Sequence, residues 1–158
     1  MALTKVQSEM SNATAPAFSA QITSNQSISA TTNTQLQFAT EVVDTASCYN
    51  NTGSTVGGIP AYSFLPTVAG YYQINLSVNN GGNVTASTFW IVNIRKNGTT
   101  VTGITGTNNS FGGGGAISAI IYLNGTSDYI DGTVNTGYAT TAVAGANSYF
   151  SASLVRPA

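Results

Sequence analysis

The alternation of apolar and polar side chains in residues 71–79, YYQINLSVN, constrains the fold more than any other part of the sequence. In an extended strand, successive side chains point to opposite faces. One face would then be apolar and the other polar, with the apolar side formed by Tyr72, Ile74, Leu76 and Val78. The same two-residue period recurs along the chain, and only residues 5–10 resemble a short helical turn. We therefore expect an all-β fold.

Composition supports a folded single domain. The chain has 158 residues, of which 6% are charged and 42% hydrophobic, whereas charged residues make up about 25% of ordinary soluble proteins. Disordered chains combine low hydrophobicity with high charge, so this one should fold. The net charge of −1 provides no basic surface for phosphates or anionic lipids, so we expect neither a nucleic-acid nor a membrane partner. The single cysteine, Cys48, cannot form an internal disulfide.

Turn signals divide the remaining sequence into strands. Asn97-Gly98 predicts a tight hairpin, and the run 116–134 reads as a second hairpin around Asn124-Gly125. The strand before the first hairpin is apolar on both faces at its start, because Phe89 and Ile91 alternate with Trp90. The glycine-rich residues 111–116 read as a loop or a strand entry. Further strands are expected at residues 17–23, 26–29, 34–43, 47–51 and 147–156.

Residues 1–15 contain nothing able to close a core, and we expect them to form an N-terminal arm before a domain that spans residues 16–158. This arm has no apolar run like that of a secretory signal, and no part of the chain approaches the roughly 20 apolar residues of a membrane span. Synthesis in a cytoplasm is therefore expected.

Several strand motifs follow one another in a characteristic order. They are AFSA (17–20), LQF (36–38), Tyr49, FLPTVAGYYQINLSV (64–78), IRKNG (94–98), IYLNGTSDYI (121–130) and YFSASLV (149–155). This order resembles the globular head of complement component q and the tumour necrosis factor superfamily. The pattern covers nearly the whole chain from residue 17, although the spacing from Pro66 to Gly70 is one residue longer than in the family and its Gly-Asp pair becomes Gly-Thr-Ser-Asp. Both changes fall in predicted turns, where insertions are tolerated.

The resemblance implies a ten-stranded jelly-roll sandwich assembled as a homotrimer. Without Gly-X-Y triplets or a signal-like segment, the chain is most similar to the bacteriophage branch of the fold, which consists of virion components. Apolar residues that point away from the predicted core are expected at the trimer interface: Tyr71, Phe89, Ile91, Tyr122 and Tyr149. The arm is expected to anchor the protein to the capsid through Leu3, Lys5, Val6 and Met10.

The sequence offers little for catalysis or metal binding. It has no histidine, the commonest general base at neutral pH. The acids form only two close pairs, Glu41 with Asp44 and Asp128 with Asp131, and no calcium-binding loop motif is present. Cys48 has no base partner in the sequence pattern. We predict no catalytic residue, no metal and no cofactor.

The first hypothesis is therefore a non-enzymatic virion protein of a tailed phage, a trimer on the particle surface that decorates or cements the capsid. Its partner would be the major capsid protein or another virion protein. The second hypothesis is a head fibre or tail receptor-binding tip that recognises a host glycan through loops such as 50–59 and 106–115, since aromatic rings and amides suit sugars. A third and weaker hypothesis is an enzyme on the same scaffold.

Overall fold

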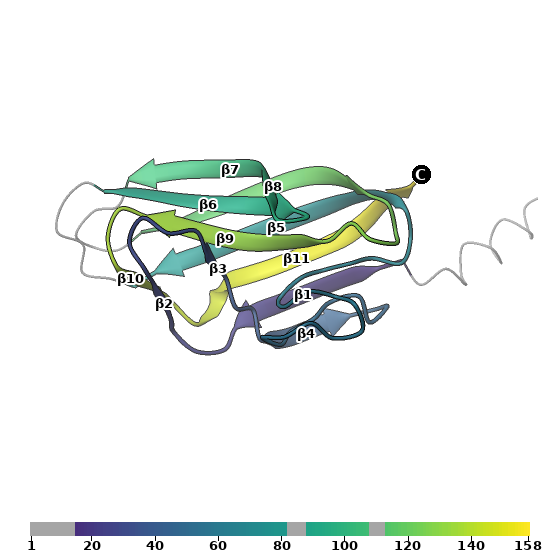
Figure 1. The fold of residues 1–158 in the computed structure, drawn as a ribbon, viewed down its shortest axis with the longest axis horizontal. Coiled ribbons are helices and arrows are strands. Elements are labelled where there is room, and N and C mark those ends of the chain that lie inside the picture. The colour runs from purple at the N-terminus through teal and green to yellow at the C-terminus, as the bar shows by residue number, and fades with distance from the viewer. Residues whose placement is uncertain (1–14, 82–87, 108–112) are drawn as a thin grey trace, which may run out of the picture.

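Two antiparallel β-sheets face each other in the computed structural model, which describes residues 15–81, 88–107 and 113–158 (Figure 1). No helix occurs among these residues, and none could therefore cross a membrane. Eleven strand segments are present in this part of the chain, and they confirm the all-β prediction. Their bounds are β1 Ala17–Ile22, β2 Gln26–Ile28, β3 Thr34–Gln35, β4 Thr40–Asp44, β5 Gly70–Asn80, β6 Phe89–Lys96, β7 Thr99–Thr107, β8 Gly113–Leu123, β9 Ile130–Thr136, β10 Thr140–Ala142 and β11 Gly145–Pro157.

Strands that are distant in sequence are neighbours in both sheets. The seven-stranded sheet, named sheet A here, has the order β2-β10-β5-β11-β1-β4, and β8 pairs with the other side of β5. The four-stranded sheet B has the order β3-β9-β6-β7. Because the chain passes repeatedly from one sheet to the other, the two sheets bury a shared core, as in a jelly roll.

The strand with the clearest alternation, β5, lies in the middle of sheet A between β11 and β8. Its inward side chains are fully buried and its outward ones are not, as the sequence predicts. The last strand, β11, follows the same rule, with Phe150 and Ala152 buried and Leu154 partly buried against the core. The two-residue period of both strands thus places one face against the core and leaves the other face pointing away from it.

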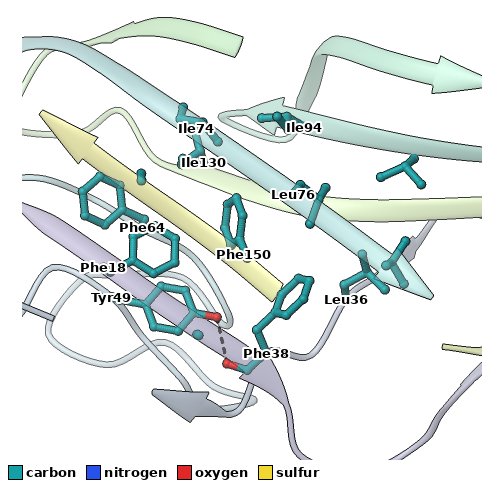
Figure 2. Packing of buried hydrophobic residues seen from close by; sticks show 14 of the residues in the cluster. Phe18, Leu36, Phe38, Tyr49, Phe64, Ile74, Leu76, Ile94, Ile130 and Phe150 are labelled. Atoms are coloured by element: carbon teal, nitrogen blue, oxygen red, sulfur yellow. Dashed lines mark hydrogen bonds between the residues drawn. The ribbon is translucent and has the colours of Figure 1, made fainter. Parts of the chain in front are cut away.

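Aromatic side chains fill one end of the core (Figure 2). The ring of Phe18 stacks on Tyr49 and Phe64 with centroids 4.4 and 4.7 Å apart, and it meets the ring of Phe150 edge-on at 5.0 Å. The Tyr49 hydroxyl donates a hydrogen bond of 2.9 Å to the carbonyl oxygen of Phe38. Burial raises the pKa of Tyr49 above its ordinary value, so the phenol stays protonated and keeps its donor.

The hairpin predicted at Asn97-Gly98 is confirmed. β6 and β7 pair directly across it, and both turn residues have positive φ angles, 53° and 78°. These are the angles of a type I′ turn, which asparagine and glycine adopt at low cost.

The second predicted hairpin, over residues 116–134, is wrong. β8 pairs with β5 in sheet A, whereas β9 pairs with β6 in sheet B, so the chain crosses between the sheets after Leu123. The Asn124 side chain closes a longer turn here, because its Oδ1 accepts hydrogen bonds from the backbone N–H groups of Thr126, Ser127 and Asp128. Gly125, with φ of 73°, lies against the backbone of Val68 and Ala69.

Two shorter strand predictions also differ from the structure. The run 34–43 divides into β3 and β4, because Leu36 and Phe38 turn into the core between them. Residues 47–51 form no strand, and Tyr49 makes only an isolated bridge to Phe64. The buried side chain of Asn50 organises the following loop instead: its Nδ2 donates to the carbonyl oxygens of Ser54, Ile59 and Pro60, and its Oδ1 accepts from Thr52.

Candidate subunit interface

The outer face of sheet A, which points away from the core, is broad and carries little charge, with Arg156 at one end, opposite Tyr71 in the register. Cross-strand register places the outward residues of β8, β5, β11 and β1 side by side. Charged groups are depleted at the centres of protein interfaces because removing them from water is costly, so a face with little charge suits association. The outward residues are Ala116, Ser118, Ile120 and Tyr122 on β8, Tyr71, Gln73, Asn75, Ser77 and Asn79 on β5, Tyr149, Ser151 and Ser153 on β11, and Ala17, Ser19 and Gln21 on β1.

Amide and hydroxyl side chains form a hydrogen-bonded ladder across the middle of this face. Gln73 Nε2 donates to Ser118 Oγ at 2.6 Å, and Ser118 Oγ donates to Asn75 Oδ1 at 2.8 Å. Asn75 Nδ2 reaches Ser151 Oγ on the neighbouring strand at 3.4 Å. Because these polar groups already have partners within the chain, covering them would leave few unpaired donors and acceptors.

One end of the face carries an exposed apolar cluster, named the tyrosine patch here. Tyr71 and Tyr122 stand opposite each other on β5 and β8 with ring centroids 5.6 Å apart. Ile120 lies two residues from Tyr122 on β8, and Val155 lies beside Arg156, the register partner of Tyr71. The exposed fraction is 47% for Tyr71, 41% for Tyr122, 59% for Ile120 and 57% for Val155. Exposed apolar clusters of this kind mark interaction surfaces.

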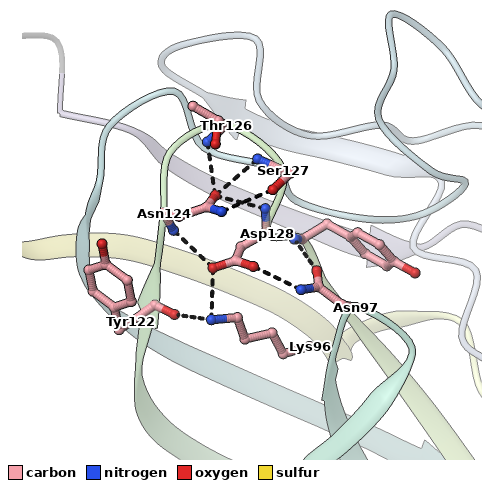
Figure 3. Close-up of polar contacts among 8 residues, drawn as sticks. Lys96, Asn97, Tyr122, Asn124, Thr126, Ser127 and Asp128 are labelled. Atoms are coloured by element: carbon pink, nitrogen blue, oxygen red, sulfur yellow. Dashed lines mark hydrogen bonds and ion pairs between the residues drawn. The ribbon is translucent and has the colours of Figure 1, made fainter.

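A polar network fixes the tyrosine patch to the end of the sandwich (Figure 3). Lys96, at the end of β6, donates to the carbonyl oxygen of Tyr122 at 2.8 Å and forms an ion pair of 2.8 Å with Asp128. The Lys96 Nζ also lies 5.6 Å from the centroid of the Tyr122 ring. Lys96 of sheet B thus holds Tyr122 of sheet A, and these contacts restrict the conformations of the tyrosine patch.

Asp128 is the acceptor at the centre of this network. Burial of the carboxyl favours the neutral form, but hydrogen bonds from Lys96, from Asn97 Nδ2 at 2.8 Å and from the backbone N–H of Asn124 at 3.0 Å outweigh it. The pKa of Asp128 is therefore below its ordinary value. The carboxylate is ionised at neutral pH and joins the hairpin at residues 97–98 to the crossing turn at 124–129.

The far end of the outer face is hollowed. Residues of β5, β8 and β11 line a shallow depression of about 420 Å³, with glycines on its β8 side and Tyr149 on its β11 side. A second depression of about 300 Å³ lies beside the loop that Asn50 organises, lined by Asn51, Thr52, Val56 and Ile59 among others. Neither depression brings charged side chains together.

No protein-family model and no curated protein matches the chain. Solved structures do match over most of its length. The chain is similar to the PRD1 vertex protein P5, with a TM-score of 0.64 and 18% identity over 89% of this chain and 73% of that one. It is also similar to murine APRIL (0.63, 12% identity, 89% and 99%) and to the globular domain of the zebrafish complement 1qA protein (0.56, 14% identity, 90% and 99%).

The chain has the complement-q/tumour necrosis factor-like jelly-roll fold. The fold that the sequence motifs implied is thereby confirmed, and a phage virion protein is among the structures that share it. Within this jelly roll, β5 at the centre of sheet A carries residues 70–78 of the segment FLPTVAGYYQINLSV, and sheet B carries the IRKNG hairpin.

The jelly roll brings together only some of the predicted interface residues. Tyr71 and Tyr122 are in contact, and Tyr149 lies on the same outer face beside the far depression. Phe89 and Ile91 lie on β6 of sheet B, on the opposite side of the sandwich, where Phe89 is partly exposed. The predicted anchoring residues Leu3, Lys5, Val6 and Met10 lie outside the described residues.

Two exposed apolar elements of the jelly roll were missed by sequence reasoning. Ile120 and Val155 complete the tyrosine patch, and Val42 and Val43 are exposed on β4, the edge strand of sheet A. The alternation of β8 gives a signal for Ile120, since it is in phase with Tyr122. No such signal exists for Val42 and Val43 of β4, because two adjacent apolar residues in a short strand are equally compatible with burial in the core.

Asp128 and Asp131 have structural roles in the jelly roll. Asp131 accepts a bidentate contact from Arg95, whose Nε lies 2.8 Å from Oδ1, and a hydrogen bond of 2.9 Å from Gln35. Asp128 is bound by Lys96, so the two carboxylates of this pair each have their own cation. Within the described residues, no group of three His, Cys, Asp or Glu side chains could hold a metal ion. Burial raises the pKa of the Cys48 thiol, which disfavours the reactive thiolate.

Proposed function

We propose that this protein is a non-enzymatic structural component of a phage virion, a homotrimer on the particle surface that decorates or cements the capsid. The observation that carries the proposal is the similarity to the PRD1 vertex protein over 89% of the chain. The outer face of sheet A, which carries little charge, supports a subunit interface. In this proposal the protein is made in the host cytoplasm and binds the major capsid protein or another virion protein.

The trimer would bury the tyrosine patch. Tyrosine and isoleucine side chains that are about half exposed in one chain gain most from association, because they carry large apolar surfaces that are still in contact with water. A cyclic trimer closes on itself, so the same surface is used in every subunit and no open edge remains. Residues 1–15 would then be free to grip the shell as an arm, through Leu3, Lys5, Val6 and Met10.

A second candidate function is a fibre or receptor-binding tip at particular vertices, with a host glycan as ligand. The name of the PRD1 protein, a vertex protein, favours this placement. The depression beside the loop at residues 50–59 would be the binding site, because it combines the amide of Asn51 with the apolar side chains of Val56 and Ile59.

Copy number in purified particles distinguishes the two placements. A cement protein should be present in hundreds of copies, and its deletion should lower the temperature at which the capsid releases its genome. A few copies at the vertices, with intact capsid stability and lost adsorption, would favour the second candidate and contradict the first.

Removal of residues 1–15 tests the arm. The truncated protein should remain trimeric in sedimentation experiments but should no longer bind empty shells that the full chain binds. A truncated protein that is monomeric would show that the arm holds the trimer together instead. Full shell binding by the truncated trimer would place the capsid contact on the jelly roll itself.

A further inference from the structure

The outer face of sheet B lies on the opposite side of the sandwich from the tyrosine patch, so it stays open when the outer face of sheet A is covered. Arg95 and Asp131, the charged pair on the described part of this face, bind each other. The outward residues around the centre of the face are uncharged: Phe89, Ile91 and Asn93 on β6, Thr133 and Asn135 on β9, and Gly103 on β7.

Two glycines allow side chains of β6 to lie close against neighbouring strands of this face. The ring of Phe89 lies beside Gly137, where an added Cβ would be 3.2 Å from the ring carbon Cε1, and Phe89 remains 38% exposed. The amide of Asn93 lies over Gly103, where an added Cβ would clash with its Oδ1. Phe89 and Asn93 are four residues apart on one strand, which separates them by about 13 Å. The face thus presents an aromatic ring and an amide at a spacing that β6 fixes.

Hydrogen-bonding groups at the centre of the face have no partners. Asn93 is only 8% exposed, yet its side chain makes no hydrogen bond to another described residue. Thr133, its register partner on β9, has a fully buried Oγ1 without a partner, and the same is true of Oδ1 of Asn135. Such groups are rare in folded proteins, because each has given up its hydrogen bonds to water. Three of them on two neighbouring strands indicate a surface that a ligand completes.

We propose that the outer face of sheet B binds a neutral oligosaccharide, with a sugar ring stacked on Phe89 and sugar hydroxyl groups hydrogen-bonded to Asn93. A hydroxyl group both donates and accepts, so it can pair with either end of the amide. An exposed aromatic ring provides the apolar contact that fixes a sugar ring in place. This inference goes beyond the proposed structural role and does not depend on it. The site also differs from the depression at residues 50–59, whose lining tyrosine, Tyr49, is buried.

The charge and the apolar area of this face argue against other ligands. Because Arg95 and Asp131 neutralise each other, a charged ligand would find no free counter-charge on the described part of the face. A protein partner would bury the amide of Asn93 at the centre of the contact, with only the Phe89 ring and the half-buried Ile91 to offset that cost. A saccharide brings its own donors and acceptors to the same amide.

Binding of hexasaccharides to the full chain tests the proposal, with isothermal titration calorimetry as the measurement. Maltohexaose, cellohexaose and chitohexaose are the neutral probes, and a heparin hexasaccharide is the anionic probe. At least one neutral probe should bind with a dissociation constant of about 1 mM or tighter. Phe89→Ala and Asn93→Ala should each weaken this binding about tenfold, because one removes the stacking contact and the other the hydrogen bonds. Gly103→Ala should also weaken it, since the new Cβ displaces the amide of Asn93.

Two controls separate a binding role from a structural one. Because the amide of Asn93 has no partner within the described chain, Asn93→Ala should keep the wild-type midpoint of urea unfolding. A lowered midpoint would show that this amide supports the fold and would overturn its assignment to the ligand. Asn147→Ala removes an exposed amide from β11 of sheet A and should leave the affinity unchanged.

The proposal is overturned if none of the neutral probes binds, or if the heparin hexasaccharide binds more tightly than all of them. Wild-type affinity in Phe89→Ala and Asn93→Ala would also overturn it, and a loss of binding in Asn51→Ala would then place the saccharide in the depression at residues 50–59. None of these results bears on the oligomeric state or on the location in a particle, so they leave the proposed structural role to its own tests.

Discussion

Replacement of Tyr71 and Tyr122 by serine should dissociate the proposed trimer without unfolding the subunit. Both residues point outward from sheet A, and the face around them already carries Ser118, Ser151 and Ser153, so serine suits the position. Within one chain the double variant loses the contact between the two rings, whose centroids are 5.6 Å apart. Such an aromatic pair contributes about 1 kcal/mol, so the isolated subunit should remain folded.

The expected loss of association follows from the exposed surface. Tyr71 and Tyr122 are 47% and 41% exposed in one chain. With about 200 Å² for each side chain, roughly 180 Å² would be removed from water when both are covered. At about 25 cal/mol per Å² this is at most about 4 kcal/mol per subunit. Because buried area converts only partly to affinity, we expect a loss of at least about 2 kcal/mol per subunit, or about thirtyfold in each contact.

Sedimentation equilibrium of the wild type and the variant measures this loss, with far-ultraviolet circular dichroism as the check on folding. The matched control is the pair Phe89→Ser and Ile91→Ser on sheet B, which removes apolar surface of similar size from the opposite side of the sandwich. The reasoning is refuted if the tyrosine variant keeps the wild-type association, or if the control dissociates the trimer as strongly.

Three further predictions concern stability, each measured by urea unfolding at a fixed protein concentration. Asp128→Asn should destabilise the fold by about 2 kcal/mol at pH 7. Its effect should vanish as pH falls through the lowered pKa of the wild-type carboxyl, because ionic stabilisation exists only above it; an undiminished difference at pH 2 would contradict this. Gly125→Ala should cost at least about 2 kcal/mol, since φ is 73° and the new Cβ would lie 2.5 Å from the Ala69 nitrogen. Phe150→Ala should cost about 3–5 kcal/mol, as it empties the centre of the aromatic core; a loss below 1 kcal/mol would show that the core collapses around the gap.

The parts of the fold that depend on local pattern were predictable. The period of β5 identifies its buried face, because alternation is a property of the strand itself. The ordered motifs then identified the jelly roll. Asn97-Gly98 was read correctly as a hairpin for the same reason, since the turn angles depend on those two residues.

The pairing of strands was harder to predict from the sequence, as the two Asn-Gly turns show. Asn124-Gly125 has the same local signal as Asn97-Gly98 but ends a strand of one sheet and leads to the other. The difference comes from contacts that are distant in sequence: Lys96 and Asn97 bind Asp128, and Gly125 packs against Val68 and Ala69. No pattern within residues 116–134 contains that information.

The candidate interface was predicted in part for the same reason. Alternation shows that Tyr71, Phe89 and Tyr122 point away from the core, but it does not show to which sheet each strand belongs. Only the assembled sandwich separates Phe89 from the tyrosines and adds Val155, which lies beyond the regular alternation at an irregularity of β11. The interface role of all five predicted residues stays a prediction, and the control variant of Phe89 and Ile91 tests two of them directly.

The loop between β4 and β5 has a consequence for protein engineering. Its shape depends on the buried amide of Asn50, which binds the backbone on both sides of the tip. The tip residues Gly57 and Gly58 have positive φ angles, and a Cβ built on either meets nothing within 4 Å. Foreign peptides grafted between these glycines would project into open solvent, while the anchoring amide keeps both ends of the graft at a fixed separation. In the proposed role on a particle surface, grafts at this tip would be displayed in many copies.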